Sequence, residues 1–253
     1  MKLYKYWSIS SQGNEEVFTR GEVYFCSARD FNDPFDCCPR VRTGYTAEEV
    51  DEYVTYLVSK ACSGWTAEDR RRKAAEIMAR VMNPAALKDW YFTLMYGFGL
   101  YCVSEIPDSI LMWSHYADNH RGFCLEFSGL GSPHPQGSPF PVSWKVNYED
   151  ERPLVDITET MRDIDTDHIV RLGLLTKSKD WAYEREWRVL ETTGTGVRVL
   201  PRGTLSGVIL GPRMTRPDEL RVRSWAGMHS TPIRLRRARL SEEHFLLELE
   251  DVA

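Results

Sequence analysis

The sequence lacks the features that mark membrane, secreted and zinc-finger proteins. No apolar run approaches the roughly 20 residues that cross a bilayer, and residues 1–6 alternate polar and aromatic side chains without a signal-peptide core. The six cysteines show no C-x-x-C spacing, which predicts reduced thiols. We therefore expect a soluble, cytoplasmic protein without membrane contact.

The sequence also lacks the short motifs of several enzyme classes. It has no G-x-S-x-G nucleophile elbow and no H-E-x-x-H zinc motif. Gly194 and Gly196 lack the third glycine of a dinucleotide-binding loop, and a strand pattern rather than a helix follows them. Cys102 and Cys124 fall within strand patterns, where a buried, inert thiol is expected. These absences argue against Rossmann and P-loop enzymes.

Composition predicts one folded domain. The chain has 253 residues, of which 42% are hydrophobic and 27% charged, enough for a single good core. Its formal net charge of -5 argues against broad, nonspecific binding to nucleic acid. Several arginines gather between Arg234 and Arg239, which leaves open either a basic face or a strand edge protected by charge.

Helix and strand patterns alternate irregularly along the chain. Capping signals at Thr46, Thr66 and Asn83 predict three early helices within about residues 46–96. Further helices are expected over residues 109–117, 156–175 and 217–225, and a surface loop over 128–141. Strands are expected over residues 3–8, 22–27, 100–104, 122–127, 142–148, 184–190, 197–200, 207–210 and 232–240. We predict a single α+β domain, residues 1–253, whose mixed or largely antiparallel sheet carries the early helices as an insertion.

Two glutamates stand close together in the segment Tyr183–Leu190. If this segment is a strand, Glu184 and Glu186 project to the same side, because residues two apart share a face. Like charges on one face repel, so a cationic or hydrogen-bonding partner must offset the cost. Candidate partners are Ser27, Lys177, Arg121, Arg188 and His115.

Three other polar and aromatic clusters have a functional and a structural interpretation. The loop with Asn32, Asp33 and Asp36 is either part of a site or a turn in which side chains satisfy backbone donors. His115 and His120 are five residues apart and do not share a helical face, so we expect no metal there. Trp113 is either a stacking residue or a core residue. Arg121 either contacts a ligand or forms an internal ion pair with Glu105 or Glu126. Lys177 lies in the third cluster, Thr176–Trp181.

Several of these motifs together resemble a bacterial family known as domain of unknown function 2971. They are Phe31-Asn32-Asp33-Pro34-Phe35-Asp36, Met112-Trp113-Ser114-His115-Tyr116-Ala117, Arg121-Gly122 and Tyr183-Glu184-Arg185-Glu186-Trp187-Arg188. The resemblance extends from Leu3 to about Arg213. It implies kinship but no activity.

A second resemblance suggests a reaction. Glu184-Arg185-Glu186, followed by aliphatic residues, looks like the E-x-E strand of ADP-ribosyltransferases, and Ser27 is similar to the serine those enzymes place after an earlier strand. The first strand, Leu3–Tyr6, has neither the His nor the Arg that grips NAD in such folds. The resemblance implies an NAD-dependent glycosyltransferase-type enzyme that binds a small nucleotide.

The same resemblance implies roles for individual residues. Glu186 would stabilise the cationic ribose formed when nicotinamide leaves, Glu184 would orient or deprotonate the acceptor, and Ser27 would hold Glu186. Tyr4 or Trp113 would stack on nicotinamide, and Lys177, Arg121 or Arg188 would neutralise the pyrophosphate. The remaining candidate binding residues are Asn32, Asp33 and His115.

Three functions stay open on the sequence. The first is an ADP-ribosyltransferase-like enzyme, such as a toxin or phage-defence effector, acting on a protein or nucleic-acid acceptor. The second is a nuclease-like or other hydrolytic effector with Asp33, Asp36, His115 and Glu186 around a divalent metal. The third is a noncatalytic binding domain in which the same residues form a polar core.

Overall fold

The computed structural model describes residues 1–61, 65–130, 142–161 and 166–252. The chain divides into two compact units, each built from separated stretches of sequence. The first unit comprises Met1–Ser27, Phe98–Val146 and Lys179–Ala253, and the second comprises Ala28–Gly97 and Asn147–Ser178. The single domain expected from the sequence stays a prediction, and the two units are described separately.

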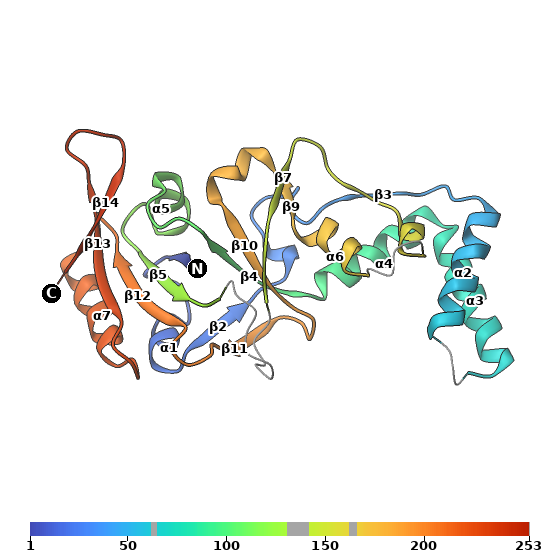
Figure 1. Ribbon diagram of the computed structural model, residues 1–253, viewed down its shortest axis with the longest axis horizontal. Helices are drawn as coiled ribbons and strands as arrows, with labels where there is room; N and C mark the ends of the chain where they lie inside the picture. Colours follow the sequence, from blue (N-terminus) through green and yellow to red (C-terminus); the bar gives the residue numbers. More distant parts are fainter. Residues whose placement is uncertain (62–64, 131–141, 162–165, 253) are drawn as a thin grey trace. The chain divides into compact units, whose positions relative to one another are not determined.

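The first unit is built on an eight-stranded sheet (Figure 1). Neighbouring strands are antiparallel except for the parallel pair β12–β13. In spatial order the strands are β14 (Leu247–Asp251), β13 (Arg234–Leu240), β12 (Leu205–Leu210), β5 (Phe123–Ser128), β1 (Lys2–Trp7), β4 (Gly99–Ser104), β10 (Glu186–Glu191) and β6 (Ser143–Lys145). This sheet confirms the predicted α+β class and its largely antiparallel character.

Helices cover both faces of this sheet. Side chains of β1 alternate, so Leu3 lies on one face and Tyr6 on the other. On the Leu3 face, α1 (Asn14–Thr19) and α7 (Arg216–Gly227) meet where the rings of Phe18 and Trp225 stack at 6.2 Å. On the Tyr6 face, α5 (Ile110–Tyr116) packs its Trp113 ring edge-on against Tyr6 at 5.3 Å. We refer to this second side as the α5 face.

A small second sheet in the first unit pairs β2 (Glu22–Phe25) with β11 (Gly196–Val199). The turn between β10 and β11 approaches β4 closely at Gly99, where a Cβ atom would lie 2.4 Å from the carbonyl oxygen of Gly194. Only glycine fits at this contact.

The second unit is mostly helical. Its helices are α2 (Ala47–Ala61), α3 (Ala67–Val81), α4 (Pro84–Tyr96) and α6 (Thr166–Leu174), with 3₁₀ turns at Ala28–Asp30 and Ile157–Met161. Two short parallel strand pairs complete it: β3 (Arg40–Val41) with β8 (Leu154–Val155), and β7 (Asn147–Glu149) with β9 (Thr176–Ser178).

The three early helices begin where the capping signals predict. Thr46 and Glu49 form a reciprocal capping box, in which each side chain accepts a hydrogen bond from the other residue's backbone N–H, at 3.2 and 2.8 Å. Thr66 Oγ1 accepts from the N–H of Asp69, and Asn83 Oδ1 accepts from the N–H of Ala85. These bonds satisfy donors that a helix start leaves without intrahelical partners.

Four expectations need correction. The strand expected over 142–148 is two strands, β6 and β7, which belong to different sheets. Within the segment 156–175, where one helix was expected, the described residues form a 3₁₀ turn at Ile157–Met161 and the α-helix α6 at Thr166–Leu174. Helix α1 and strand β14 were not expected. The strand expected over 184–190 begins only at Glu186, as described below. Most of the loop expected over 128–141 lies outside the described residues.

The arginines of β13 do not form an open basic face. Each has an acidic partner: Arg234 binds Asp251, Arg236 binds Glu126, Arg237 binds Glu219 and Arg239 binds Glu250. Their charge is therefore largely neutralised locally, which removes the sequence-based reason for a nucleic-acid site there. Within the described residues, no helix is long and apolar enough to cross a membrane.

Candidate functional site

The two glutamates do not lie on one strand. Glu184 is the last residue of a 3₁₀ helix (Lys179–Glu184), and β10 begins at Glu186. Between them, Arg185 has a left-handed backbone with φ of 44°, a conformation that costs free energy for any residue with a side chain. The prediction that both project from one strand is thus wrong, because Glu184 lies in the 3₁₀ helix that precedes β10.

The end of β4, the strand beside β10, is hydrogen-bonded to the backbone around Arg185. Ser104, at the end of β4, donates a hydrogen bond from its hydroxyl to the carbonyl oxygen of Glu184 at 2.6 Å and accepts one from the N–H of Ile106 at 3.1 Å. The N–H of Glu105 donates to the carbonyl oxygen of Arg185 at 3.0 Å. These bonds fix the carbonyl oxygens of Glu184 and Arg185.

Glu186 forms a buried ion pair with Arg188, two residues later on the same face of β10. Arg188 donates from Nε to Oε1 at 2.8 Å and from a terminal nitrogen to Oε2 at 3.0 Å. Arg188 is 0% exposed and Glu186 is 5% exposed. This two-pronged geometry fixes the plane of the carboxylate.

Glu184 is held by a different donor. The hydroxyl of Tyr116, from the last turn of α5, donates to Glu184 Oε1 at 2.7 Å. Glu184 is 3% exposed, so this carboxylate is also removed from bulk water. The ring of His115 lies 6.4 Å from that of Tyr183, on the segment that carries Glu184. Helix α5 and the 3₁₀ helix thus meet at this site.

Strand register places Glu186 in a polar row on the α5 face. Ser104 pairs with Glu186 on one side and with Tyr4 on the other, and Tyr4 pairs with Glu126. Directly paired residues share a face, so Tyr4 and Glu186 stand two strands apart, about 10 Å. Burial, and then the carboxylate of Glu126, raise the pKa of Tyr4.

The two aromatic residues expected to stack on nicotinamide are core residues. Trp113 is 0% exposed, and its indole N–H donates to the carbonyl oxygen of Pro107 at 2.9 Å. Tyr4 is 8% exposed and packs in the same hydrophobic cluster. Neither ring presents an open face to a ligand in this structure.

Among the described residues, Arg121 forms no ion pair with Glu105 or Glu126, the two partners expected for an internal strut. Glu105 instead accepts from Lys145 at 2.9 Å and from the indole N–H of Trp187 at 2.8 Å. Burial opposes ionisation of Glu105, but these two hydrogen bonds outweigh it and lower its pKa. Glu126 pairs with Lys2 and Arg236. Arg121 is exposed just after α5, and its role in ligand binding stays a prediction.

Ser27 follows the end of β2. Its neighbour Cys26 forms a backbone bridge with Leu100, four residues along β4 from Ser104, the strand partner of Glu186. Four residues of extended chain span about 13 Å, which separates the bridge at Leu100 from Ser104 along β4. The role expected for Ser27 in holding Glu186 stays a prediction.

Three of the predicted binding residues belong to the second unit. Asp33 Oδ1 accepts from the N–H of Phe35 at 2.9 Å, a bond of the kind that the turn interpretation expects, and its role in ligand binding stays a prediction. Lys177 pairs with Asp36 at 3.3 Å, and both side chains are buried. Asn32 is exposed.

Metal and thiol chemistry have little support at these positions. Among the described residues, no three His, Cys, Asp or Glu side chains gather closely enough to hold a metal ion. Burial, and then the charge of Glu186, raise the pKa of the Cys102 thiol, and burial does the same at Cys124. Both thiols are thus protonated at neutral pH, as expected for inert cysteines.

Sequence reasoning missed the residues that position the glutamates. Tyr116 lies within a motif that the sequence singled out, but its partner is Glu184, 68 positions away. Ser104 carried no signal, because a serine that ends a strand is common and its role depends on the neighbouring strand. The left-handed conformation at residue 185 could not be predicted, because the residue is an arginine and not the glycine or asparagine that commonly adopts it.

Comparison with known proteins finds one family model that matches part of the chain. Residues 112–189 match the family model described as protein of unknown function (DUF2971). The match includes Met112–Ala117 and Tyr183–Arg188 and leaves out Phe31–Asp36. No curated protein and no solved structure matches the chain. Tyr116, Glu184, Glu186 and Arg188 all lie within the segment over which the chain is similar to this family.

Proposed function

We propose that this chain is an ADP-ribosyltransferase-like enzyme that uses NAD as its substrate. The observation that carries the proposal is the pair of buried carboxylates, Glu184 and Glu186, held by separate donors on either side of the left-handed Arg185. Burying two like charges next to a strained backbone opposes folding. Such costs cluster at functional sites, where they preorganise reacting groups.

Glu186 is suited to stabilise positive charge. When the nicotinamide C–N bond breaks, the leaving group takes the bonding electrons and positive charge develops on the ribose carbon. Arg188 fixes both oxygens of Glu186, and a carboxylate has further lone pairs that can accept a ribose hydroxyl. A carboxylate fixed before the reaction stabilises such charge without reorganising.

Glu184 is suited to receive a proton. The hydroxyl of Tyr116, which is neutral, donates to Glu184, whereas the guanidinium of Arg188 donates to Glu186. In the proposed reaction the acceptor's nucleophile bonds to the ribose carbon and gives its proton to Glu184. The two carboxylates thus have different environments and different roles.

The pyrophosphate of NAD needs cationic contacts that Arg188 does not supply. Arg188 is fully buried against Glu186, so we assign the pyrophosphate to exposed Arg121 and assign Arg188 to positioning Glu186. The acceptor is a protein or a nucleic acid, and a cytoplasmic toxin or phage-defence effector is the biological role that fits loss of NAD.

A second candidate is a noncatalytic binding domain. It is favoured by the same ion pair, because Arg188 already contacts both oxygens of Glu186 as an internal strut would.

Nicotinamide release from NAD separates the two functions. An enzyme releases nicotinamide, and Glu186→Gln reduces the rate by about 100-fold or more. Glu184→Gln reduces transfer to the acceptor more than hydrolysis of NAD. A binding domain releases none, and NAD does not raise its melting temperature.

A further inference from the structure

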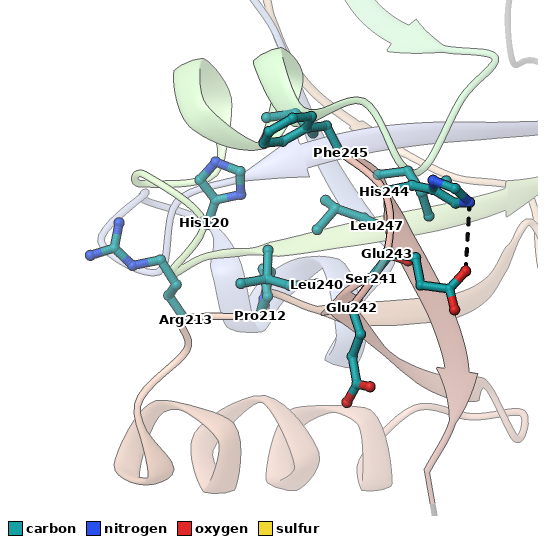
Figure 2. A pocket seen from close by; sticks show the side chains of 12 residues that line it. His120, Pro212, Arg213, Leu240, Ser241, Glu242, Glu243, His244, Phe245 and Leu247 are labelled. Atoms are coloured by element: carbon teal, nitrogen blue, oxygen red, sulfur yellow. Dashed lines mark ion pairs between the residues drawn. The ribbon is translucent and has the colours of Figure 1, made fainter.

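A pocket opens beside the hairpin that joins β13 and β14 (Figure 2). It lies within the first unit and has a volume of about 560 Å³. None of the residues of the carboxylate site lines it. Its walls are mostly apolar and include Ile110, Pro212, Leu240, Phe245 and Leu247.

The rim of this pocket exposes large apolar side chains. Phe245 is fully exposed, with a relative exposure of 104%, and Leu240 is 70% exposed. Ile110 and Leu246, which also line the pocket, are each at least 40% exposed. Isolated exposed apolar residues are common, but a gathering of them around a pocket is typical of an interaction surface.

Charges of both signs flank the same pocket. Figure 2 shows Arg213 on one side and Glu242 and Glu243 on the other. Within the described residues Arg213 is exposed and has no ion-pair partner. Glu243 has only a long contact of 3.9 Å to His244.

The wall of the pocket is held rigidly. Asp118, Asn119 and His120 are three consecutive residues with left-handed backbone. The N–H of His120 donates to the carbonyl oxygen of Trp113 at 3.0 Å, and its carbonyl oxygen accepts from the N–H of Arg213 at 3.0 Å. Because these hydrogen bonds already order the wall, it loses little further conformational entropy when a partner binds.

We propose that this surface is the contact between two copies of the chain related by a twofold axis. Phe245 of each copy enters the pocket of the other, and Arg213 of each copy faces Glu242 and Glu243 of the other. In such an interface the same patch occurs on both sides, so it must complement itself.

The surface has the properties that this arrangement requires. It carries a protruding ring and a pocket, and it carries one exposed cation and two carboxylates, so each feature has its complement on the same molecule. A membrane surface fits less well, because Glu242 and Glu243 would face anionic lipid head groups.

Sedimentation equilibrium of the full chain over a range of concentrations tests the proposal. The wild type is expected to dimerise, and Phe245→Ser is expected to weaken dimerisation by about tenfold or more. Phe35→Ser is the matched control, because Phe35 is 61% exposed in the second unit and its loss leaves dimerisation unchanged. A wild type that is monomeric at every concentration overturns the proposal, as does a dimer that tolerates Phe245→Ser.

Charge reversal provides an independent readout. Arg213→Glu alone and the double change Glu242→Arg with Glu243→Arg are each expected to weaken the homodimer, because like charges then meet. Mixing the two variants restores opposite charges at both contacts and is expected to restore dimerisation. Failure of the mixture to associate contradicts the proposal. So does a monomer that sediments with phosphatidylserine vesicles through Phe245, which would make the patch a membrane contact.

Discussion

Arg188 and Glu186, two residues apart on β10, form a two-pronged ion pair whose members are 0% and 5% exposed. This pair links the fold to the proposed chemistry. Arg188 fixes the carboxylate of Glu186, which would face the ribose, and both residues belong to the same strand.

Loss of one member of this pair should destabilise the protein strongly. Arg188→Met leaves the carboxylate of Glu186 buried without its guanidinium, and we expect the free energy of unfolding to fall by about 3–5 kcal/mol. Urea unfolding measures the change. The double variant, with Glu186→Leu added, should lose less than the sum of the two single variants, because no lone charge remains.

The exposed pair Arg239–Glu250 is the matched control for this prediction. Both side chains are at least half exposed, so Arg239→Met should cost no more than about 1 kcal/mol. Equal losses at Arg188 and Arg239 would contradict the account of a buried ion pair.

Ser104 should matter for activity more than for stability. Ser104→Ala removes the hydroxyl that holds the carbonyl oxygen of Glu184 and should lower the free energy of unfolding by about 1–2 kcal/mol. The turn at Arg185 then loosens, and the rate of NAD cleavage falls although no reacting group is lost. Parallel urea and nicotinamide assays measure both effects. An unchanged rate would mean that Ser104 does not position the site.

The site illustrates what the sequence reveals and what it conceals. The spacing of Glu184 and Glu186 marked them as unusual, and the structure shows both to be buried. The spacing did not reveal the left-handed turn between them, because that conformation is imposed by Ser104 from another strand. Local patterns cannot report such a contact between distant segments.

The fold shows the same limit. Helices α2, α3 and α4 begin at capping residues that are visible in the sequence, because a cap bonds to its own chain. The short helix α1 and the edge strand β14 escaped prediction. Their apolar residues, such as Val17 and Leu247, are few, and they are explained only by the clusters in which they pack.

Gly122 and Gly227 should respond in opposite directions to alanine. A Cβ atom on Gly122 would lie 2.1 Å from the carbonyl oxygen of Trp7, whereas one on Gly227 meets nothing within 4 Å. We expect Gly122→Ala to lower the free energy of unfolding by at least about 2 kcal/mol. Gly227→Ala, at the end of α7, should raise it slightly. Thermal and urea unfolding test both, and a harmless Gly122→Ala would contradict the packing of β5 against β1.

Asp156 should contribute to acid sensitivity. Burial opposes ionisation of Asp156, but hydrogen bonds from Arg42 and Thr158 outweigh it and place its pKa below the ordinary 3.8. A lowered folded-state pKa gives stability that is complete above pH 3.8 and is lost as the pH falls through the folded value. Urea midpoints between about pH 6 and pH 2.5 should therefore fall less steeply for Asp156→Asn than for the wild type. Identical slopes would show that Asp156 is not the responsible group.

The account depends most directly on the rate at which the wild type and Glu186→Gln release nicotinamide from NAD. Glu186→Gln also disturbs a buried pair, so Leu125→Ala serves as the control. Leu125 is 0% exposed on the opposite face of the sheet, and its truncation should cost about 2–5 kcal/mol. With every variant shown to be folded at the assay temperature, we predict release by the wild type and Leu125→Ala and a loss of about 100-fold or more in Glu186→Gln. No release by the wild type, or equal release by Glu186→Gln, would contradict the proposed function.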